Sequence, residues 1–190
     1  MEVQKSDRTQ RALFAGGCFW CLEALYEQIP GVLEARSGYC GGSSANPTYE
    51  EVCTGLTGHA ETVELTFNPK VVTYRELVDL FWQFHDPTTL NRQGADIGTQ
   101  YRSAIFVLDA EQEAIARQSM SAVQAAFDRP ILTSIEPAGT FWPAEEWHQD
   151  YYRHNPDAPY CRFVIAPKLD KVSRTLHMPE SGPGAHLQGS

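Results

Sequence analysis

Two cysteines flank a pair of large aromatic residues in the segment GGCFWC at 16–21. The apolar residues before it predict a strand over 11–15, and apolar residues at 22, 25, 26 and 29 predict a helix over 18–29. Cys18 would then lie in the first turn of a helix, where free backbone N–H groups and the positive end of the dipole favour a thiolate. A pKa below the free value of about 8.5 would make this sulfur a strong nucleophile.

The same cysteine pair allows three interpretations. Cys18 can act as a lone nucleophile, with Phe19 and Trp20 forming the wall of a pocket. Cys18 and Cys21 can instead form a C-x-x-C pair for dithiol–disulfide exchange. A zinc site is the third possibility, and it would need Cys161 and either His148 or His154 as further ligands.

A carboxylate lies on the apolar face of a predicted strand over 59–67. The period of two places Glu61 on the same face as the apolar residues at 63, 65 and 67. Burial there would raise the pKa of Glu61, so that it could hold a proton and serve as a general acid. Glu64 points to the opposite face and is expected to be an ordinary solvated carboxylate.

Two phenols and one further carboxylate lie near predicted loops. Tyr49 follows the segment NPT at 46–48, and Tyr101 begins a predicted strand after GTQ at 98–100. Asp96 lies in the same connection as Tyr101. Taken singly, each tyrosine is more typical of a half-buried core residue with a satisfied hydroxyl group, and Asp96 of a turn.

The remaining elements alternate between helix and strand without a linker. Strands are predicted over 32–39, 101–108 and 131–136, and helices over 73–85, 110–127 and 144–154. A long connection over 86–100 joins the helix over 73–85 to the strand over 101–108. Thr73 and Asp109 are the expected N-caps of two of these helices. The pattern predicts an α+β fold, a two-layer sandwich with a mixed, largely antiparallel sheet of the ferredoxin-like type, with a doubly wound sheet as the alternative.

The chain organisation is predicted to be simple. Residues 11–178 should form a single catalytic domain, with a flexible N-terminus at 1–10 and a disordered tail at 179–190 that is rich in glycine and polar residues.

Charge and composition exclude several classes of partner. The formal net charge is −9 and no cluster of lysine and arginine occurs, which argues against nucleic-acid binding. No apolar run approaches the roughly 20 residues of a membrane-spanning helix. Five cysteines without a secretion signal favour thiol chemistry in the cytoplasm over a disulfide framework.

Several separated motifs, in order along the chain, resemble the peptide methionine sulfoxide reductase family of the A type. They are GGCFW at 16–20, SGYCGG at 37–42, NPTYEEVCTG at 46–55, TGHAETVE at 57–64, RQGADIGTQYRSAIF at 92–106 and FWPAEEWHQDYYRHNP at 141–156. The resemblance covers roughly residues 11–170.

The resemblance implies reduction of the S epimer of methionine sulfoxide, free or in peptides and proteins. Cys18 matches the nucleophile of the family, and Phe19 and Trp20 match the wall that holds the S-methyl group of the substrate. Glu61 matches the acid that protonates the sulfoxide oxygen. Tyr49 and Tyr101 match phenols that hydrogen-bond this oxygen, with Asp96 as a supporting carboxylate; neither a cofactor nor a metal is expected.

The resemblance also implies how the enzyme is regenerated. Oxygen transfer would leave Cys18 as a sulfenic acid, which condenses with a second thiol to a disulfide. Cys161 matches a resolving cysteine on a mobile C-terminal segment, and thioredoxin would restore the thiols. Cys21 stands where many relatives have glycine, so it is the alternative resolving residue, although closing this bridge would require the helix to relax. Cys53 is expected to pack, and Cys40 has no predicted role.

Overall fold

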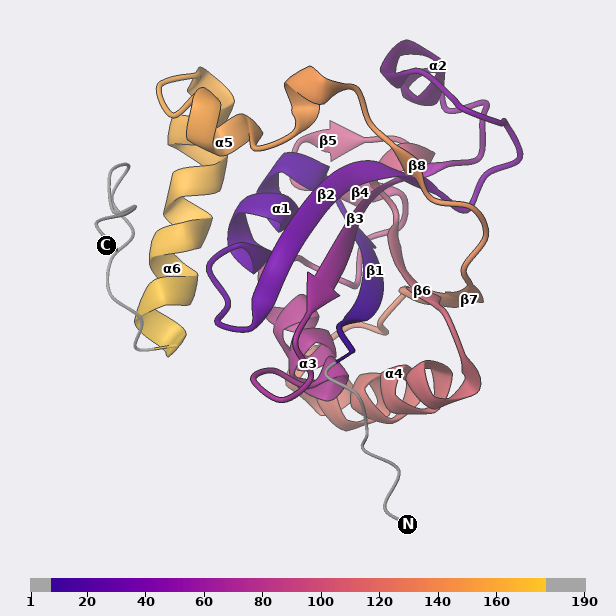
Figure 1. Ribbon diagram of the computed structural model, residues 1–190, viewed down its shortest axis with the longest axis vertical. Coiled ribbons are helices and arrows are strands. Elements are labelled where there is room, and N and C mark those ends of the chain that lie inside the picture. The colour runs from indigo at the N-terminus through magenta and orange to yellow at the C-terminus, as the bar shows by residue number, and fades with distance from the viewer. Residues whose placement is uncertain (1–7, 177–190) are drawn as a thin grey trace.

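The computed structural model describes residues 8–176, and most of its strands form one mixed sheet (Figure 1). This six-stranded sheet has the order β7-β6-β1-β3-β2-β8, and β4 and β5 form a separate hairpin. The strands are β1 Gln10–Gly16, β2 Val32–Cys40, β3 Ala60–Phe67, β4 Arg92–Gln93, β5 Asp96–Ile97, β6 Ser103–Val107, β7 Ser134–Pro137 and β8 Trp142–Pro143.

Helices connect the strands and complete the C-terminal part of the described chain. The α-helices are α1 Phe19–Tyr26, α2 Tyr49–Cys53, α3 Tyr74–Phe84, α4 Ala110–Val123, α5 Tyr151–His154 and α6 Ala166–Leu176. The shorter turns are η1 Thr99–Tyr101, η2 Gln124–Ala126 and η3 Glu146–His148, all 3-10 helices, and the π-helical turn η4 Cys161–Ile165.

The pairing of the strands follows from two helical crossovers. α1 leads from β1 to β2, and β3 returns between them, antiparallel to both. α3 then leads to β6, which pairs antiparallel with the free edge of β1. The β6–β7 pair is parallel. The fold is therefore α+β with a mixed, largely antiparallel sheet, which excludes the doubly wound alternative.

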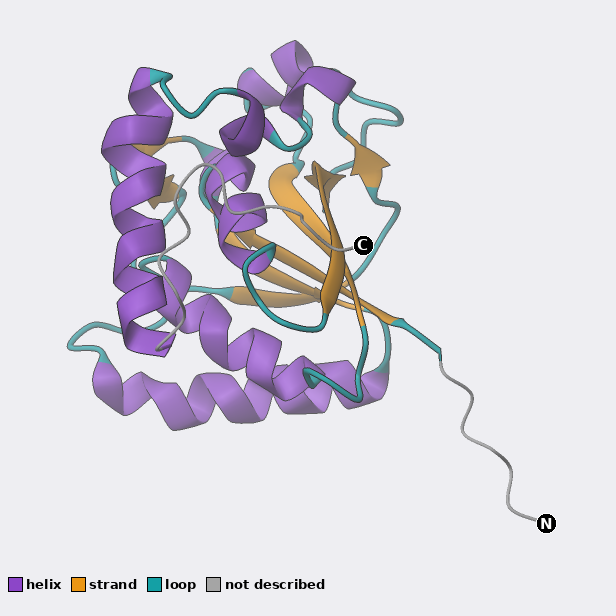
Figure 2. Ribbon diagram, turned by 60° about the vertical axis from the view of Figure 1, so that its left-hand side comes forward, coloured by secondary structure: helices purple, strands orange, loops and turns teal. Residues whose placement is uncertain are grey.

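The two faces of the sheet are covered differently. The larger core joins one face to α1, α3 and α6, and Figure 2 shows these helices beside the strands. On the other face a small core is covered by the loop that carries Phe141. This loop approaches so closely at Gly38 that an added Cβ would lie 2.4 Å from the Phe141 ring. Glycine is therefore needed where β2 pairs with β8.

The predicted helix over 144–154 is wrong. The segment forms η3 and α5 instead, separated by Asp150, whose φ of 52° is left-handed. Contacts with two distant elements fix this break between η3 and α5. Gln149 bonds with its side chain to the backbone of Ser37, and Asp150 donates its N–H to the carboxylate of Glu23.

Other bounds differ by smaller amounts. The helix predicted over 18–29 ends at Tyr26, and the strand predicted from Tyr101 begins at Ser103, because residues 99–101 form η1. The connection over 86–100 contains the β4–β5 hairpin, and α6 was not predicted. The capping boxes of α2 and α3, at Thr48 and Thr73, are both present.

The terminal segments predicted at 1–10 and 179–190 lie outside the described residues, apart from 8–10. Across 8–176, the helices are too short or too polar to span a membrane.

Candidate active site

Cys18 lies at the junction between β1 and α1. It is the N-cap of α1, with an extended backbone (φ −60°, ψ 126°). Gly17 before it has a φ of +90°, and an added Cβ would lie 2.7 Å from the side chain of Gln93. Gln93 is itself held by two 3.0 Å hydrogen bonds with the backbone of Asp86. Glycine is required at 17 both for its conformation and for this close approach.

The first N–H groups of α1 are shared between the thiol and a carboxylate. The N–H of Phe19 donates to Glu61 Oε2 at 3.3 Å. The N–H of Trp20 donates to the Cys18 sulfur. Cys18 and Glu61 therefore meet at one helix start, although 43 positions separate them in the sequence.

The carboxylate of Glu61 is buried on the face that the strand period predicts, with 2% of the residue exposed. Burial raises the pKa of Glu61 to about 8, against the opposing effect of the Phe19 N–H. Glu61 is therefore mainly protonated at pH 7, which is the state that a proton donor needs.

The expected lowering of the Cys18 pKa is wrong for this state of the molecule. Only 8% of Cys18 is exposed, and burial raises the pKa of its thiol, with further upward effects from Cys21 and from the charge of Glu61. The hydrogen bond from Trp20 opposes these effects but does not overcome them. Because Glu61 takes the first helical N–H, the helix start stabilises a thiolate less than the sequence suggested.

The neighbouring thiol behaves in the opposite way. A side-chain hydrogen bond with Cys18 lowers the pKa of Cys21 to about 7, and the Lys168 ammonium and the Tyr160 hydroxyl act in the same direction.

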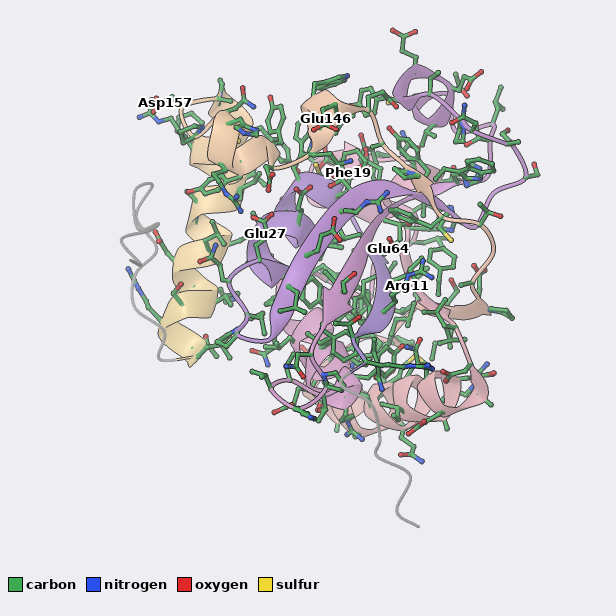
Figure 3. The ribbon with its side chains drawn as sticks, in the orientation of Figure 1. Arg11, Phe19, Glu27, Glu64, Glu146 and Asp157 are labelled. Atoms are coloured by element: carbon green, nitrogen blue, oxygen red, sulfur yellow. The ribbon has the colours of Figure 1, made fainter. Side chains whose placement is uncertain are left out.

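Glu64 is not the solvated carboxylate that was expected. It is buried on the second face of the sheet, near Arg11 (Figure 3). It forms ion pairs with Arg11 and, at 3.8 Å, with Arg36. Two arginines on the neighbouring strands satisfy its charge, whereas no ion pair involving Glu61 is found in residues 8–176.

The two predicted phenols and Asp96 all lie near Glu61. Burial raises the pKa of the Tyr101 hydroxyl, and the charges of Glu61, Asp96 and Cys18 act in the same direction. Burial, the Cys53 thiol and Glu61 raise the pKa of Tyr49. Both phenols remain O–H donors at neutral pH. Asp96 accepts a 2.8 Å hydrogen bond from Tyr160.

Aromatic rings surround the start of α1. Phe19 is fully buried, with ring centroids 5.8 Å from Tyr39 and 5.0 Å from His148. Trp20 stacks on Tyr151 at 3.7 Å and donates its indole N–H to His148 Nδ1 at 3.0 Å. Burial lowers the pKa of His148 to about 4, so this imidazole is neutral.

Comparison with known proteins decides the family. A family model described as peptide methionine sulfoxide reductase matches residues 10–180. The chain is 54% identical to peptide methionine sulfoxide reductase MsrA of Deinococcus radiodurans over 172 residues, covering 90% of this chain and 84% of that protein. It is 52% identical to MsrA of Pasteurella multocida over 164 residues, covering 86% and 94%.

The chain belongs to the peptide methionine sulfoxide reductase family.

Solved structures of the same family agree. Reduced Mxr1 from Saccharomyces cerevisiae has a TM-score of 0.78 and 36% identity, covering 81% of this chain and 90% of that chain. Mxr1 in complex with Trx2 has a TM-score of 0.55 and 25% identity, covering 80% and 89%. Every site residue described above lies within the region that the peptide methionine sulfoxide reductase model matches.

The sequence analysis did not assign Glu145 or Tyr160 to this reductase site, and it named His148 only as a possible zinc ligand. Glu145 accepts hydrogen bonds from the Tyr39 hydroxyl at 3.3 Å and from the Tyr49 N–H at 3.2 Å. His148 holds Trp20, and Tyr160 reaches both Asp96 and Cys21. Glu145 and His148 lie in the quoted segment FWPAEEWHQD, and Tyr160 directly precedes Cys161, so proximity to known motifs was the available signal.

The other cysteines of the reductase occupy distinct places. Cys161 is buried at the first residue of η4, in a helical turn that packs against α1, rather than in an irregular segment. Cys40 lies in the small second core, and Cys53 is exposed on α2.

The zinc alternative has no support in residues 8–176. The one group of three or more potential ligands there consists of Glu23, Glu27 and Asp150, without any cysteine or histidine.

Proposed function

We propose that this chain reduces the S epimer of methionine sulfoxide, free or in peptides and proteins, to methionine. The observation that carries this proposal is the meeting of Cys18 with a protonated Glu61 at the start of α1. A sulfoxide oxygen departs from sulfur only when its developing negative charge is stabilised, and a neutral carboxyl group within reach of the nucleophile supplies that proton.

The sulfoxide oxygen is transferred from the substrate to the sulfur of Cys18. The Cys18 sulfur attacks the sulfoxide sulfur as Glu61 donates its proton to the oxygen. Oxygen transfer then leaves Cys18 as a sulfenic acid and releases the thioether, while the original thiol proton of Cys18 restores Glu61. The ionised form of Glu61 would repel a thiolate at Cys18. While Glu61 is protonated it is neutral, so this repulsion is absent when the thiolate forms.

The surrounding side chains position the substrate in this proposal. Tyr49 and Tyr101 donate hydrogen bonds to the sulfoxide oxygen, since both keep their protons at neutral pH. Phe19 and Trp20 provide the apolar wall for the S-methyl group. Asp96 is a supporting carboxylate that is hydrogen-bonded to Tyr160.

A second thiol then converts the sulfenic acid to a disulfide, and thioredoxin reduces it. Cys161 and Cys21 are the two candidates for resolution. The relative Mxr1, solved in complex with Trx2, supports a thioredoxin as the reductant.

A dithiol–disulfide exchanger is the second candidate function, because the Cys18 and Cys21 thiols interact directly. Glu61 distinguishes the two functions, since disulfide exchange does not require a proton donor at an oxygen.

We further propose that residues 11–178 form one catalytic domain with a ferredoxin-like, two-layer arrangement. The antiparallel order β6-β1-β3-β2, with α1 and α3 as the crossovers, supports it. A cytoplasmic location is proposed because all five cysteines are free thiols, as is typical of a reducing compartment.

A single-turnover assay without reductant tests the reductase proposal. The separated S and R sulfoxides of N-blocked methionine are mixed with equimolar protein, and the methionine derivative formed is measured. We expect the S sulfoxide to react and the R sulfoxide to remain. Glu61→Gln should slow this turnover by at least about 10²-fold, since it removes the general acid.

Glu64→Gln on the same strand is the matched control and should leave the turnover rate close to that of the native protein. Equal rates for Glu61→Gln and the native protein, or preferential consumption of the R sulfoxide, would contradict the proposal.

A further inference from the structure

His148 is a fully buried imidazole that lies between two side chains of the proposed substrate pocket. Its ring centroid is 5.6 Å from that of Trp20 and 4.5 Å from that of Tyr49. Trp20 is a proposed wall for the S-methyl group, and Tyr49 is a proposed donor to the sulfoxide oxygen. The imidazole therefore lies against the parts of the pocket that hold two different substituents of the substrate sulfur.

The hydrogen bond from Trp20 fixes the tautomer of this imidazole. An indole N–H can only donate, so His148 Nδ1, which accepts it at 3.0 Å, carries no proton. Because the ring is neutral, its single proton is on Nε2. This buried N–H has no hydrogen-bond partner in residues 8–176, and Glu145 Oε2 lies 3.6 Å from the nitrogen. A buried donor without a partner costs free energy, and the nearby carboxylate charge reduces this cost.

Glu145 extends these contacts to the start of α2. Both oxygens of its carboxylate accept the backbone N–H of Tyr49, at 3.2 and 3.3 Å, and one of them also accepts the Tyr39 hydroxyl at 3.3 Å. Glu145 and Tyr49 are 96 positions apart, so this contact holds the start of α2 beside η3. A continuous set of contacts thus links the indole wall of the pocket to the phenol.

Resting on the proposed reductase function, we propose that Glu145 and His148 are a positioning pair that sets the width of the substrate pocket, and so restricts the alkyl group on the substrate sulfur to methyl. A sulfoxide whose oxygen is held by Tyr49 places its alkyl group against Trp20. When these two side chains are held at a fixed separation, an S-ethyl group is too long by one methylene. Loss of the pair lets the two sides of the pocket move apart and makes room for it.

Steady-state kinetics with two substrates tests this proposal. The kcat/KM is measured for the S sulfoxides of N-blocked methionine and N-blocked ethionine, which differ by one methylene on the sulfur. The native protein should prefer the methyl substrate by at least about 10-fold, as is typical for one methylene in a fitted pocket. In Glu145→Ala this preference should fall several-fold. A loss of folded protein would lower both rates equally, so the ratio reports the shape of the pocket and not stability.

Glu146→Ala is the matched control, since Glu146 is the exposed neighbour of Glu145, and it should keep the native preference. Glu145→Gln retains an acceptor oxygen for the Tyr49 N–H and should keep most of the preference. A native preference close to one, or an unchanged preference in Glu145→Ala, would overturn the positioning pair while leaving the reductase function intact. Failure of the native protein to reduce either sulfoxide would instead overturn the reductase function, and the positioning role with it.

The tautomer of His148 is measured independently of activity. Long-range ¹⁵N–¹H correlation spectra of protein labelled with ¹⁵N-histidine show which ring nitrogen carries the proton, and the signals of His148 are those that disappear in His148→Gln. We expect a neutral ring that is protonated at Nε2 at pH 7. A proton on Nδ1 would overturn the positioning pair, because the ring could then accept nothing from Trp20 and donate nothing to Glu145.

Discussion

Two glutamates three positions apart on β3 show how neighbours decide the chemistry of a buried carboxyl group. Glu64 is buried beside Arg11 and Arg36, which satisfy its charge. Glu61 on the other face accepts a single long hydrogen bond within residues 8–176, from the Phe19 N–H, and burial raises its pKa to about 8. Burial without a cation keeps a carboxyl group protonated, and this difference explains why Glu61 rather than Glu64 can donate a proton.

A third buried glutamate predicts how stability depends on pH. Glu23 in α1 accepts hydrogen bonds from the Ser37 hydroxyl and the Asp150 N–H, and burial raises its pKa to about 7. Between pH 4.5 and 7 the folded state holds this proton more tightly than the unfolded state does, so the contribution of Glu23 to stability falls as pH rises. Glu23→Gln keeps one acceptor oxygen for the Asp150 N–H, can donate from its amide nitrogen to the Ser37 hydroxyl, and removes the titration.

The measurement is the free energy of unfolding by urea for both proteins from pH 5 to pH 8. The variant should gain stability relative to the native protein up to about pH 7, after which the difference should become constant. A difference that stays flat from pH 5 to pH 8 would show that Glu23 has an ordinary pKa.

At this scale the sequence predicts the direction in which a side chain points better than its ionisation. The period of β3 placed Glu61 on the apolar face correctly. The pKa of Cys18 could not be predicted, because it depends on Glu61, which takes a helical N–H, and on the thiol of Cys21.

Two helices begin with the same capping box but have different expected roles, one in stability and one in function. Thr73 caps α3, an eleven-residue helix that packs in the main core. Thr48 caps α2, a five-residue helix whose first residue is Tyr49. The same local motif thus anchors a core helix in one case and a proposed substrate phenol in the other.

We expect Thr73→Ala to lower the free energy of unfolding by about 1 kcal/mol and to leave kcat/KM for the sulfoxide close to native. Thr48→Ala should loosen the position of Tyr49. Expressed as free energies, its effect on kcat/KM should therefore be larger than its effect on unfolding. Urea unfolding and steady-state kinetics on both variants check this. Equal losses of kcat/KM in the two variants would argue against a role for α2 in placing the phenol.

The segment over 144–154 shows why some elements could not be predicted. Its polar and aromatic residues fit a helix locally, but the Asp150 N–H donates to Glu23 and the Gln149 side chain bonds the backbone of Ser37, both more than a hundred positions away. Elements whose hydrogen bonds close locally, such as α3 with its capping box, were predicted almost to the residue.

At the scale of the whole molecule, the site assembles from segments spread over most of the chain. Cys18 comes from the β1–α1 junction, Glu61 from β3, Tyr49 from α2, Asp96 from the β4–β5 hairpin and Tyr160 from the turn before η4. Figure 1 shows α2, β5 and α5 gathered at one end of the sheet, above the start of α1. Spacing along the sequence cannot predict such a convergence, although the separate motifs identified most of its members.

The protonation state of Glu61 at neutral pH is the most direct test of its proposed role as the proton donor. Difference infrared spectroscopy between the native protein and Glu61→Gln, titrated from pH 5 to pH 10, isolates the carbonyl stretch of this one carboxyl group. We predict a protonated carboxyl band that is present at pH 6 and disappears with a midpoint near pH 8. A carboxylate band already complete at pH 6 would contradict the claim that Glu61 supplies the proton for sulfoxide reduction.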